Sequence, residues 1–136
     1  MTRIPVPLVP KWLRWTGVVA VAAFVFVFSV LTAPPEQAVV PEFSLVPLDK
    51  WRHFLAYGGV AAALGYAVVD RNVPTRRLVA LVVVVPVLYG FGIELVQATQ
   101  PDRFFGFGDA YANAIGALLV APLVALRAHY DLIRVP

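Results

Sequence analysis

The sequence has 136 residues, of which 60% are hydrophobic and 14% are charged. A soluble globular domain carries about 25% charged residues, so this composition argues against an ordinary soluble fold. Cysteine is absent, which excludes disulfides, thiolate nucleophiles and cysteine metal sites. The net charge of +3 alone would be compatible with nucleic-acid binding, but the distribution of the basic residues argues against that function.

Four apolar stretches follow one another along the chain. The predicted helices span approximately residues 12–33, 50–69, 77–98 and 108–127. Each approaches the roughly 20 residues that a helix needs to cross the hydrocarbon core of a bilayer. The connections are short, so residues 1–136 are predicted to form a single domain. The predicted fold is all-α, an integral membrane four-helix bundle with up-down-up-down topology.

The first stretch is predicted to be a retained anchor helix rather than a signal peptide. Its apolar run is about twice as long as a usual signal core, and Leu31 stands where a cleavage site needs a small residue. Pro34 and Pro35 are expected to end the helix. The connection 34–48 is the longest in the chain, and its mixture of acidic and apolar residues could place it on the membrane surface.

Most basic residues fall on one side of the predicted bundle. Eight of the eleven lie before the first helix, between the second and third, or after the fourth. These residues are Arg3, Lys11, Arg14, Arg71, Arg76, Arg77, Arg127 and Arg134. By the positive-inside rule, both termini are expected in the cytoplasm. We therefore expect a multi-pass protein of the cell membrane whose basic residues contact lipid head groups, with no nucleic-acid partner.

Small residues recur at intervals of four in the second and fourth predicted helices. Gly58 and Ala62 form one such pair, and Ala112 and Gly116 form another. Small residues at this spacing let the backbones of two helices approach closely. The pattern predicts tight packing along these two faces.

Polar residues interrupt the apolar stretches at one predicted side of the membrane. They occupy the start of the second helix, the end of the third with the loop after it, and the start of the fourth. These residues are Asp49, Lys50, His53, Tyr57, Glu94, Gln97, Arg103, Asp109 and Asn113. Within each helix they recur mostly at intervals of three, four or seven, so they share a face. Ionisable residues at membrane depth are costly unless paired, which makes this set a candidate site.

The polar residues are assigned two kinds of role. His53, Glu94 and Asp109 are the candidate catalytic residues, as acid, base or orienting group. The candidate ligand-binding residues are Asp49, Lys50, Tyr57, Gln97, Arg103 and Asn113. Structural roles compete with these assignments, because the aspartates could cap their helices and the amides could join helices. A structural role explains Glu94 least well, since a carboxylate within the span needs a partner: His53, Lys50, Arg103 or a metal.

The ordered set of motifs resembles the VanZ-like family of small membrane proteins. The resemblance rests on Asp49-Lys50-x-x-His53-x-x-x-Tyr57, Gly92-Ile93-Glu94-Leu95-x-Gln97, Pro101-x-Arg103 and Asp109-x-x-x-Asn113-x-x-Gly116. It covers roughly residues 45–120, and it departs from the expected pattern at Gly108, where a serine or another small polar residue is expected. The founding members are linked to teicoplanin resistance, so the resemblance implies an envelope context and a site, but no defined reaction.

Two functions are weighed most closely. The favoured one is binding of a lipid-linked or phosphate-bearing ligand, or of a membrane protein partner, at the outer leaflet. Lys50, Arg52 and Arg103 would hold the phosphate. The alternative is an acid/base enzyme that acts on a lipid-linked envelope precursor through His53 and Glu94. No HExxH, P-loop or GxSxG motif supports catalysis.

Three further alternatives are weaker. The first is a metal site formed by Asp49, His53, Glu94 and Asp109. Its spacing is irregular and it has one histidine, so no metal or other cofactor is predicted. Proton or ion movement lacks a continuous polar path, because the cytoplasmic halves of the helices are apolar. The last alternative is a packing network without a ligand, which Glu94→Gln should spare.

Overall fold

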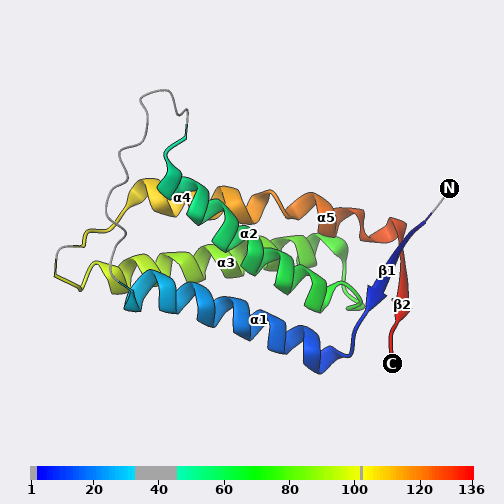
Figure 1. Cartoon of the computed structure of the whole chain (residues 1–136). Coiled ribbons are helices and arrows are strands. Elements are labelled where there is room, and N and C mark those ends of the chain that lie inside the picture. Colours follow the sequence, from blue (N-terminus) through cyan, green and yellow to red (C-terminus); the bar gives the residue numbers. More distant parts are fainter. Residues whose placement is uncertain (1–2, 33–45, 102) are drawn as a thin grey trace.

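The structure is a computed structural model that describes residues 3–32, 46–101 and 103–136. The chain is mostly helical, as predicted (Figure 1). The helices are α1 (Lys11–Phe26), α2 (Leu48–Val68), α3 (Thr75–Gln97), α4 (Phe107–Leu118) and α5 (Ala121–Ala125). A π-helical segment, Val27–Leu31, extends α1, and a 3-10 turn, Leu126–His129, follows α5. Most of the connection 34–48, with its expected place on the membrane surface, lies outside the described residues.

Among the residues that the structure describes, three helical segments are long and apolar enough to cross a membrane: Lys11–Leu31, Thr75–Gln97 and Phe107–His129. Within the described chain, α2 is not among them. Lys50, Arg52 and His53 near its start lower its hydropathy. α2 packs instead against α1, α3 and α4, and it buries residues from Tyr57 to Val68. Three of the four predicted spans thus meet the requirements for crossing a membrane, and a span through α2 stays a prediction.

Successive helices run in opposite directions along a common axis (Figure 1). The start of α2, the end of α3 and the start of α4 therefore lie at one end of the molecule. Both described ends of the chain lie at the other end. The core between the helices consists mainly of alanine, valine and leucine, and Tyr57 and Ile93 are its larger members toward the first end.

Glycines allow α2 and α4 to lie very close together, as their spacing predicted. A Cβ atom on Gly116 would lie 2.6 Å from the backbone oxygen of Phe54. A Cβ atom on Gly58 would lie 3.3 Å from the backbone oxygen of Gly116. The α2–α4 contact therefore brings residues on facing turns, including those of the polar set, within side-chain reach.

The fourth predicted helix is interrupted. The prediction was a continuous helix over approximately 108–127, but α4 ends at Leu118 and α5 begins at Ala121. Pro122 explains the break, because it has no N–H to donate to the carbonyl of Leu118 four residues earlier. The two segments together still reach the length of a membrane span.

Two short strands correct the all-α prediction. β1 (Ile4–Leu8) and β2 (Tyr130–Arg134) form a parallel pair with Ile4 opposite Tyr130 and Leu8 opposite Arg134. β1 contains two prolines at alternate positions, Pro5 and Pro7. Alternate residues of an edge strand direct their N–H positions away from the partner, so prolines are tolerated there.

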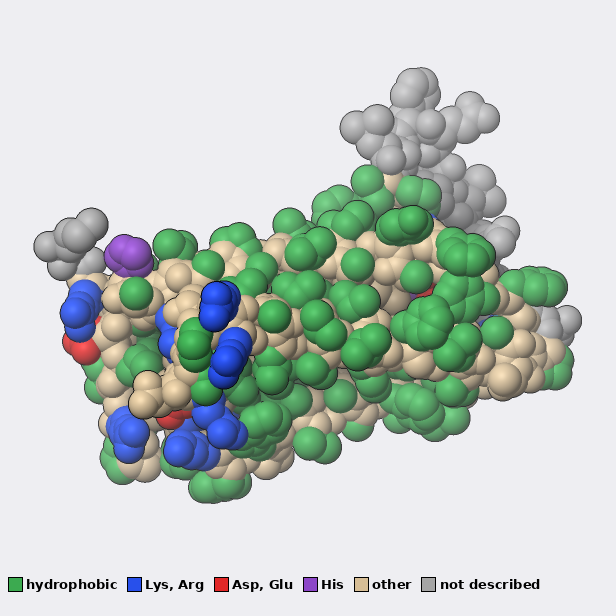
Figure 2. All heavy atoms as spheres, turned by 180° about the vertical axis from the view of Figure 1, so that it is seen from behind, with side chains coloured by type: hydrophobic (Ala, Val, Ile, Leu, Met, Phe, Trp, Pro, Cys, Tyr) green, Lys and Arg blue, Asp and Glu red, His purple; other side chains and the backbone are tan. Residues whose placement is uncertain are grey.

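Basic side chains gather at the end of the molecule that carries these strands (Figure 2). Two of them are structural rather than free for lipid. Arg14 is buried, with 5% of its surface exposed, and it donates to the two carboxylate oxygens of Asp70 at 2.9 and 3.0 Å. Arg127 donates to backbone oxygens of Val69, Arg71 and Val73 after the end of α2. Hydrogen bonding to Arg14 lowers the pKa of Asp70 below its ordinary value.

Candidate functional site

The three predicted catalytic residues lie together. His53 comes from α2, Glu94 from α3 and Asp109 from α4. One nitrogen of His53 and one carboxylate oxygen from each acid all lie within 4.8 Å of one another. They meet because three helix ends reach the same side of the molecule and the glycines hold α2 against α4.

Lys50 stands at the rim of this group. Its ammonium pairs with the Oδ1 atom of Asp109 and, at 2.7 Å, with the Oδ2 atom of Asp49. The side chains of Lys50 and Asp109 are each 27% exposed, whereas that of Asp49 is 56% exposed. The rim is therefore accessible from the end of the molecule.

Neither aspartate acts as the helix cap that the sequence suggested. Pro47 precedes α2 and Gly106 precedes α4, and neither described helix start has a side-chain cap hydrogen bond. Asp49 and Asp109 lie inside the first turns of their helices. Their charges face the positive end of the helix dipole, but their oxygen atoms point to Lys50.

The imidazole of His53 is held by two contacts. Its Nδ1 atom lies 2.7 Å from the side-chain oxygen of Asn113. An amide oxygen can only accept, so Nδ1 carries the hydrogen, and in the neutral ring Nε2 is left with a lone pair. Nε2 lies 3.5 Å from Oδ1 of Asp109. The ring also stacks on Tyr57, with 6.3 Å between the ring centres and 6° between the planes.

Glu94 is the most buried member of the group, with 1% of its surface exposed. Its Oε2 atom accepts a hydrogen bond from the backbone N–H of Gly106 at 3.2 Å. Its Oε1 atom is buried and has no hydrogen-bond partner among residues 3–32, 46–101 and 103–136. Among the described residues, one of the two oxygen atoms of this carboxylate therefore has no hydrogen-bond donor.

Two glycines make room for the group. A Cβ atom on Gly90 would lie 2.7 Å from the ring of Tyr57 and 2.8 Å from Nδ2 of Asn113. A Cβ atom on Gly106 would collide with the carboxylate of Asp109. Gly90 lies four residues before Glu94, on the same face of α3. Gly106 was missed, because its role depends on the loop path between α3 and α4.

Gln97 and Arg103 lie elsewhere, against the end of α1. Gln97 Nε2 donates to the carbonyl of Ser29 at 2.6 Å. Arg103 donates to the carbonyls of Ser29 and Thr32 through its two terminal nitrogens. Gln100, which the sequence did not single out, donates to the carbonyl of Val30 at 3.0 Å. These side chains satisfy carbonyls that the end of a helix leaves free.

A separate cavity of about 330 Å³ lies at the opposite end of the molecule. Lys11, Arg14, Asp70 and Arg134 contribute to its lining. The carboxylate of Asp70 is already paired with Arg14. Among the described residues that line it, the cavity therefore lacks a free carboxylate next to a basic group, unlike the group around Glu94. The candidate site is therefore the group of Asp49, Lys50, His53, Glu94, Asp109 and Asn113, which we call the polar cluster.

The polar cluster offers a lone pair on His53, an unsatisfied carboxylate oxygen on Glu94 and an ammonium on Lys50. These groups can exchange protons, bind a cation or hold a polar head group. Comparison with protein-family models, with curated proteins and with solved structures gives no match for this chain.

Proposed function

We propose that this chain is a four-helix integral membrane protein with both termini in the cytoplasm. Its polar cluster binds the head group of a lipid-linked, phosphate-bearing ligand at the outer leaflet. The observation that carries the proposal is the position of Lys50, His53 and Asp109. They are partly exposed at the end of a helical body whose long segments are apolar enough to cross a membrane.

The outer surface of the helices supports the membrane setting. Large apolar side chains are exposed along the segments Lys11–Leu31, Thr75–Gln97 and Phe107–His129, among them Phe28, Leu88 and Leu119 at 58%, 63% and 68%. Figure 2 shows such side chains covering the middle of the molecule, between the basic end and the other end. A monomeric soluble protein rarely exposes apolar surface this continuous, whereas a bilayer favours it.

The charge distribution supports the orientation. Basic residues gather at the end that carries β1 and β2, and the polar cluster lies at the opposite end. The positive-inside rule then places the cluster at the outer face, at the depth of the lipid head groups. The resemblance to VanZ-like proteins motivates an envelope context for the ligand.

The chemistry of the cluster suits a head group that bears both a phosphate and hydroxyl groups. Lys50 can donate to phosphate oxygens as a compact positive charge. Asp49 and Asp109 can accept hydrogen bonds from hydroxyl groups, such as those of a sugar. Arg103 has no part in this proposal, because its terminal nitrogens already donate to α1.

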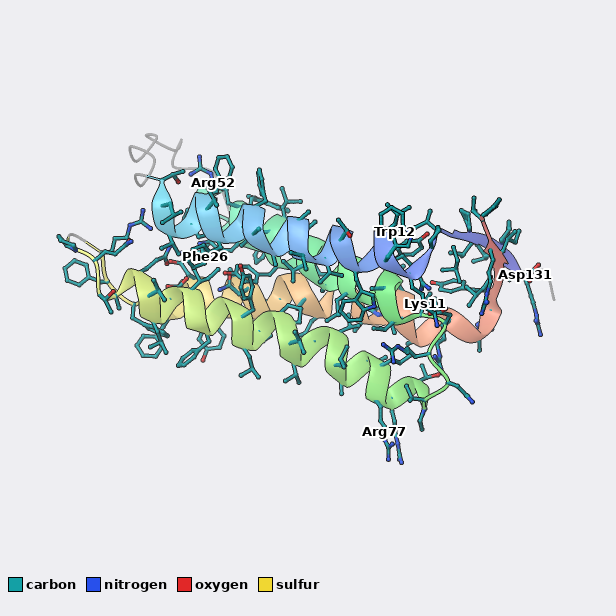
Figure 3. The ribbon with its side chains drawn as sticks, turned by 90° about the horizontal axis from the view of Figure 1, so that it is seen from below. Lys11, Trp12, Phe26, Arg52, Arg77 and Asp131 are labelled. Atoms are coloured by element: carbon teal, nitrogen blue, oxygen red, sulfur yellow. The ribbon has the colours of Figure 1, made fainter. Side chains whose placement is uncertain are left out.

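Native mass spectrometry in mild detergent tests the proposal. The wild-type protein should retain a mass that fits a phosphate-bearing lipid, and Lys50→Ala should lose it. Arg77→Ala is the control, because Arg77 is also an exposed basic residue but lies at the opposite end of the molecule (Figure 3). No retained lipid in the wild type, or equal loss in both variants, would contradict the proposal.

A second function is favoured by one specific observation, the orientation of His53. Asn113 fixes the tautomer of His53, and a carboxylate oxygen of Asp109 lies beside Nε2. This arrangement suits His53 as a general base that accepts a proton at Nε2. In this case the protein turns over the lipid-linked ligand. Single-turnover assays on the lipid found by mass spectrometry should show conversion by the wild type and none by His53→Ala.

A further inference from the structure

We infer that the polar cluster is a site for one divalent transition-metal cation, of which zinc is the best probe. The ligands are Nε2 of His53, Oε1 of Glu94 and a carboxylate oxygen of Asp109. This inference concerns the same site as the proposed function. Only the lipid ligand that the bound cation would contact rests on the proposed function.

The geometry brings the three donors to nearly the right separation. One ligand atom from each of the three residues lies within 4.8 Å of the other two, and the residues come from three different helices. In a tetrahedral zinc site with each donor about 2.1 Å from the ion, neighbouring donors are about 3.4 Å apart. Zinc binding would therefore draw the ligand atoms closer together by up to about 1.4 Å, a shift within the reach of side-chain rotation.

The unsatisfied oxygen of Glu94 is the independent observation that points to a ligand. Glu94 is 99% buried, and within the described chain its Oε1 atom has no hydrogen-bond partner. Gly106 already satisfies Oε2. A buried acceptor left without a partner costs about 1–3 kcal/mol, and more when charged. A cation bound between Glu94 and His53 removes this cost.

The hydrogen bond to Asn113 prepares His53 as a ligand. With the hydrogen on Nδ1, the lone pair of Nε2 lies on the side of Asp109, at 3.5 Å from Oδ1. A lone pair beside a carboxylate is repelled unless a positive charge lies between them. Histidine ligands of metals almost always donate their other ring hydrogen to an oxygen, as His53 does.

The charges around the site leave room for a divalent cation. Asp49, Glu94 and Asp109 bring three carboxylates, and Lys50 is the ammonium that pairs with two of them. Arg103 is held by the end of α1, and Arg52 is exposed. One nitrogen and two carboxylate oxygens form a donor set that zinc accepts, with further positions open for water or substrate.

A bound cation would also reconcile the acidic cluster with a phosphate-bearing ligand. Lys50 alone offsets one of the three carboxylates, so a phosphate approaching the rim meets excess negative charge. A metal ion that shares the phosphate with the carboxylates removes this repulsion.

Zinc binding to the purified protein, without added lipid, tests the inference. The protein carries a Strep-tag rather than a histidine tag, is treated with chelator and is then titrated with zinc by calorimetry. We expect the wild-type chain to bind one zinc ion. In Glu94→Gln and in His53→Ala, the affinity for zinc should fall by about 100-fold or more. His129→Ala is the matched control, because His129 is the second of two histidines and is exposed at the opposite end.

A spectroscopic readout keeps the test decisive if a variant does not fold. Cobalt added to the wild-type protein should give visible absorption bands that zinc abolishes, and no cysteine is present to produce them elsewhere. No zinc uptake by the wild type would overturn the inference, as would equal affinity in His53→Ala and His129→Ala. Zinc binding without any retained lipid would uphold the cation site and contradict the lipid-binding function, so the two failures are distinct.

Discussion

His53 on α2 donates its Nδ1 hydrogen to the side-chain oxygen of Asn113 on α4, across 2.7 Å. Both residues lie next to the closest approach of the two helices, where Gly116 faces the backbone of Phe54. The orientation of the imidazole is therefore set by helix packing rather than by the rim of the site. The same contact exposes Nε2 to Asp109.

Removing the amide of Asn113 should release the ring of His53. We expect Asn113→Ala to allow both ring tautomers and to weaken zinc binding by about 10- to 100-fold, since residues that orient a metal ligand have effects of this size. Nitrogen-15 chemical shifts of the imidazole report the tautomer. Asn113→Asp keeps an acceptor at the same place, so it should retain the Nδ1 hydrogen. An unchanged tautomer in Asn113→Ala would contradict this account.

The close approach of α2 and α4 should make Gly116 intolerant of a side chain. In Gly116→Ala the new Cβ atom would lie 2.6 Å from the backbone oxygen of Phe54, and neither backbone can yield cheaply. We expect a loss of about 1–3 kcal/mol in the free energy of unfolding, measured in detergent.

Gly92→Ala is the matched control for that substitution. Gly92 also lies inside a helix, α3, and within the described chain nothing lies within 4 Å of a Cβ atom built on it. Alanine should therefore leave stability unchanged or raise it by up to about 1 kcal/mol. Equal losses at both positions would mean that the two helices are not packed as closely as described.

These positions also mark what the sequence could and could not predict. Spacing placed His53, Glu94 and Asp109 on helix faces, and alternation of the helices placed those faces at one end. Both steps depend only on helical periodicity and on short connections, which are local properties. The meeting of the three residues was therefore predictable, and their ligand atoms lie within 4.8 Å of one another.

The partners of Gln97 and Arg103 were not predictable in the same way. Their side chains reach the carbonyls of Ser29 and Thr32, which lack partners within the helix because the helical segment ends at Leu31. The spacing of the polar residues does not encode where the first helix ends or which path the loop between α3 and α4 follows. The strand pair β1–β2 was missed for a similar reason, because it joins segments from the two ends of the chain.

Arg103→Ala should lower stability and leave zinc binding intact. The variant removes one donor from the carbonyl of Thr32 and one from the carbonyl of Ser29, which keeps its hydrogen bond from Gln97; each hydrogen bond from a charged donor contributes about 1.5–3 kcal/mol. Thermal unfolding measures the first effect and calorimetry the second. Loss of ligand binding at unchanged stability would restore the phosphate-binding role that the sequence suggested for Arg103.

Acid should weaken the contact between Arg14 and Asp70. Because the pKa of Asp70 is lowered in the folded state, its carboxylate stabilises the fold fully at pH values above the ordinary aspartate pKa of about 3.9. This contribution is lost as the pH falls through the lower, folded pKa. The difference in melting temperature between wild type and Asp70→Asn should therefore be largest near pH 7 and shrink toward pH 3.

Asp131→Asn is the control for this pH series, because Asp131 is exposed and lies at the same end of the molecule (Figure 3). Its melting temperature should follow that of the wild type at every pH. A difference between wild type and Asp70→Asn that stays constant from pH 7 to pH 3 would contradict the assignment to the Asp70 carboxylate.

The proposed orientation in the membrane can be tested with single cysteines, because the chain has none of its own. Val73 and Thr99 are exposed beyond the ends of α2 and α3, at opposite ends of the helices. With the basic end inside the cell, a membrane-impermeant maleimide should label Thr99→Cys in intact cells. Val73→Cys should react only after the membrane is opened. The reverse pattern would place the polar cluster at the cytoplasmic face, and labelling of both in intact cells would argue against a membrane-spanning fold.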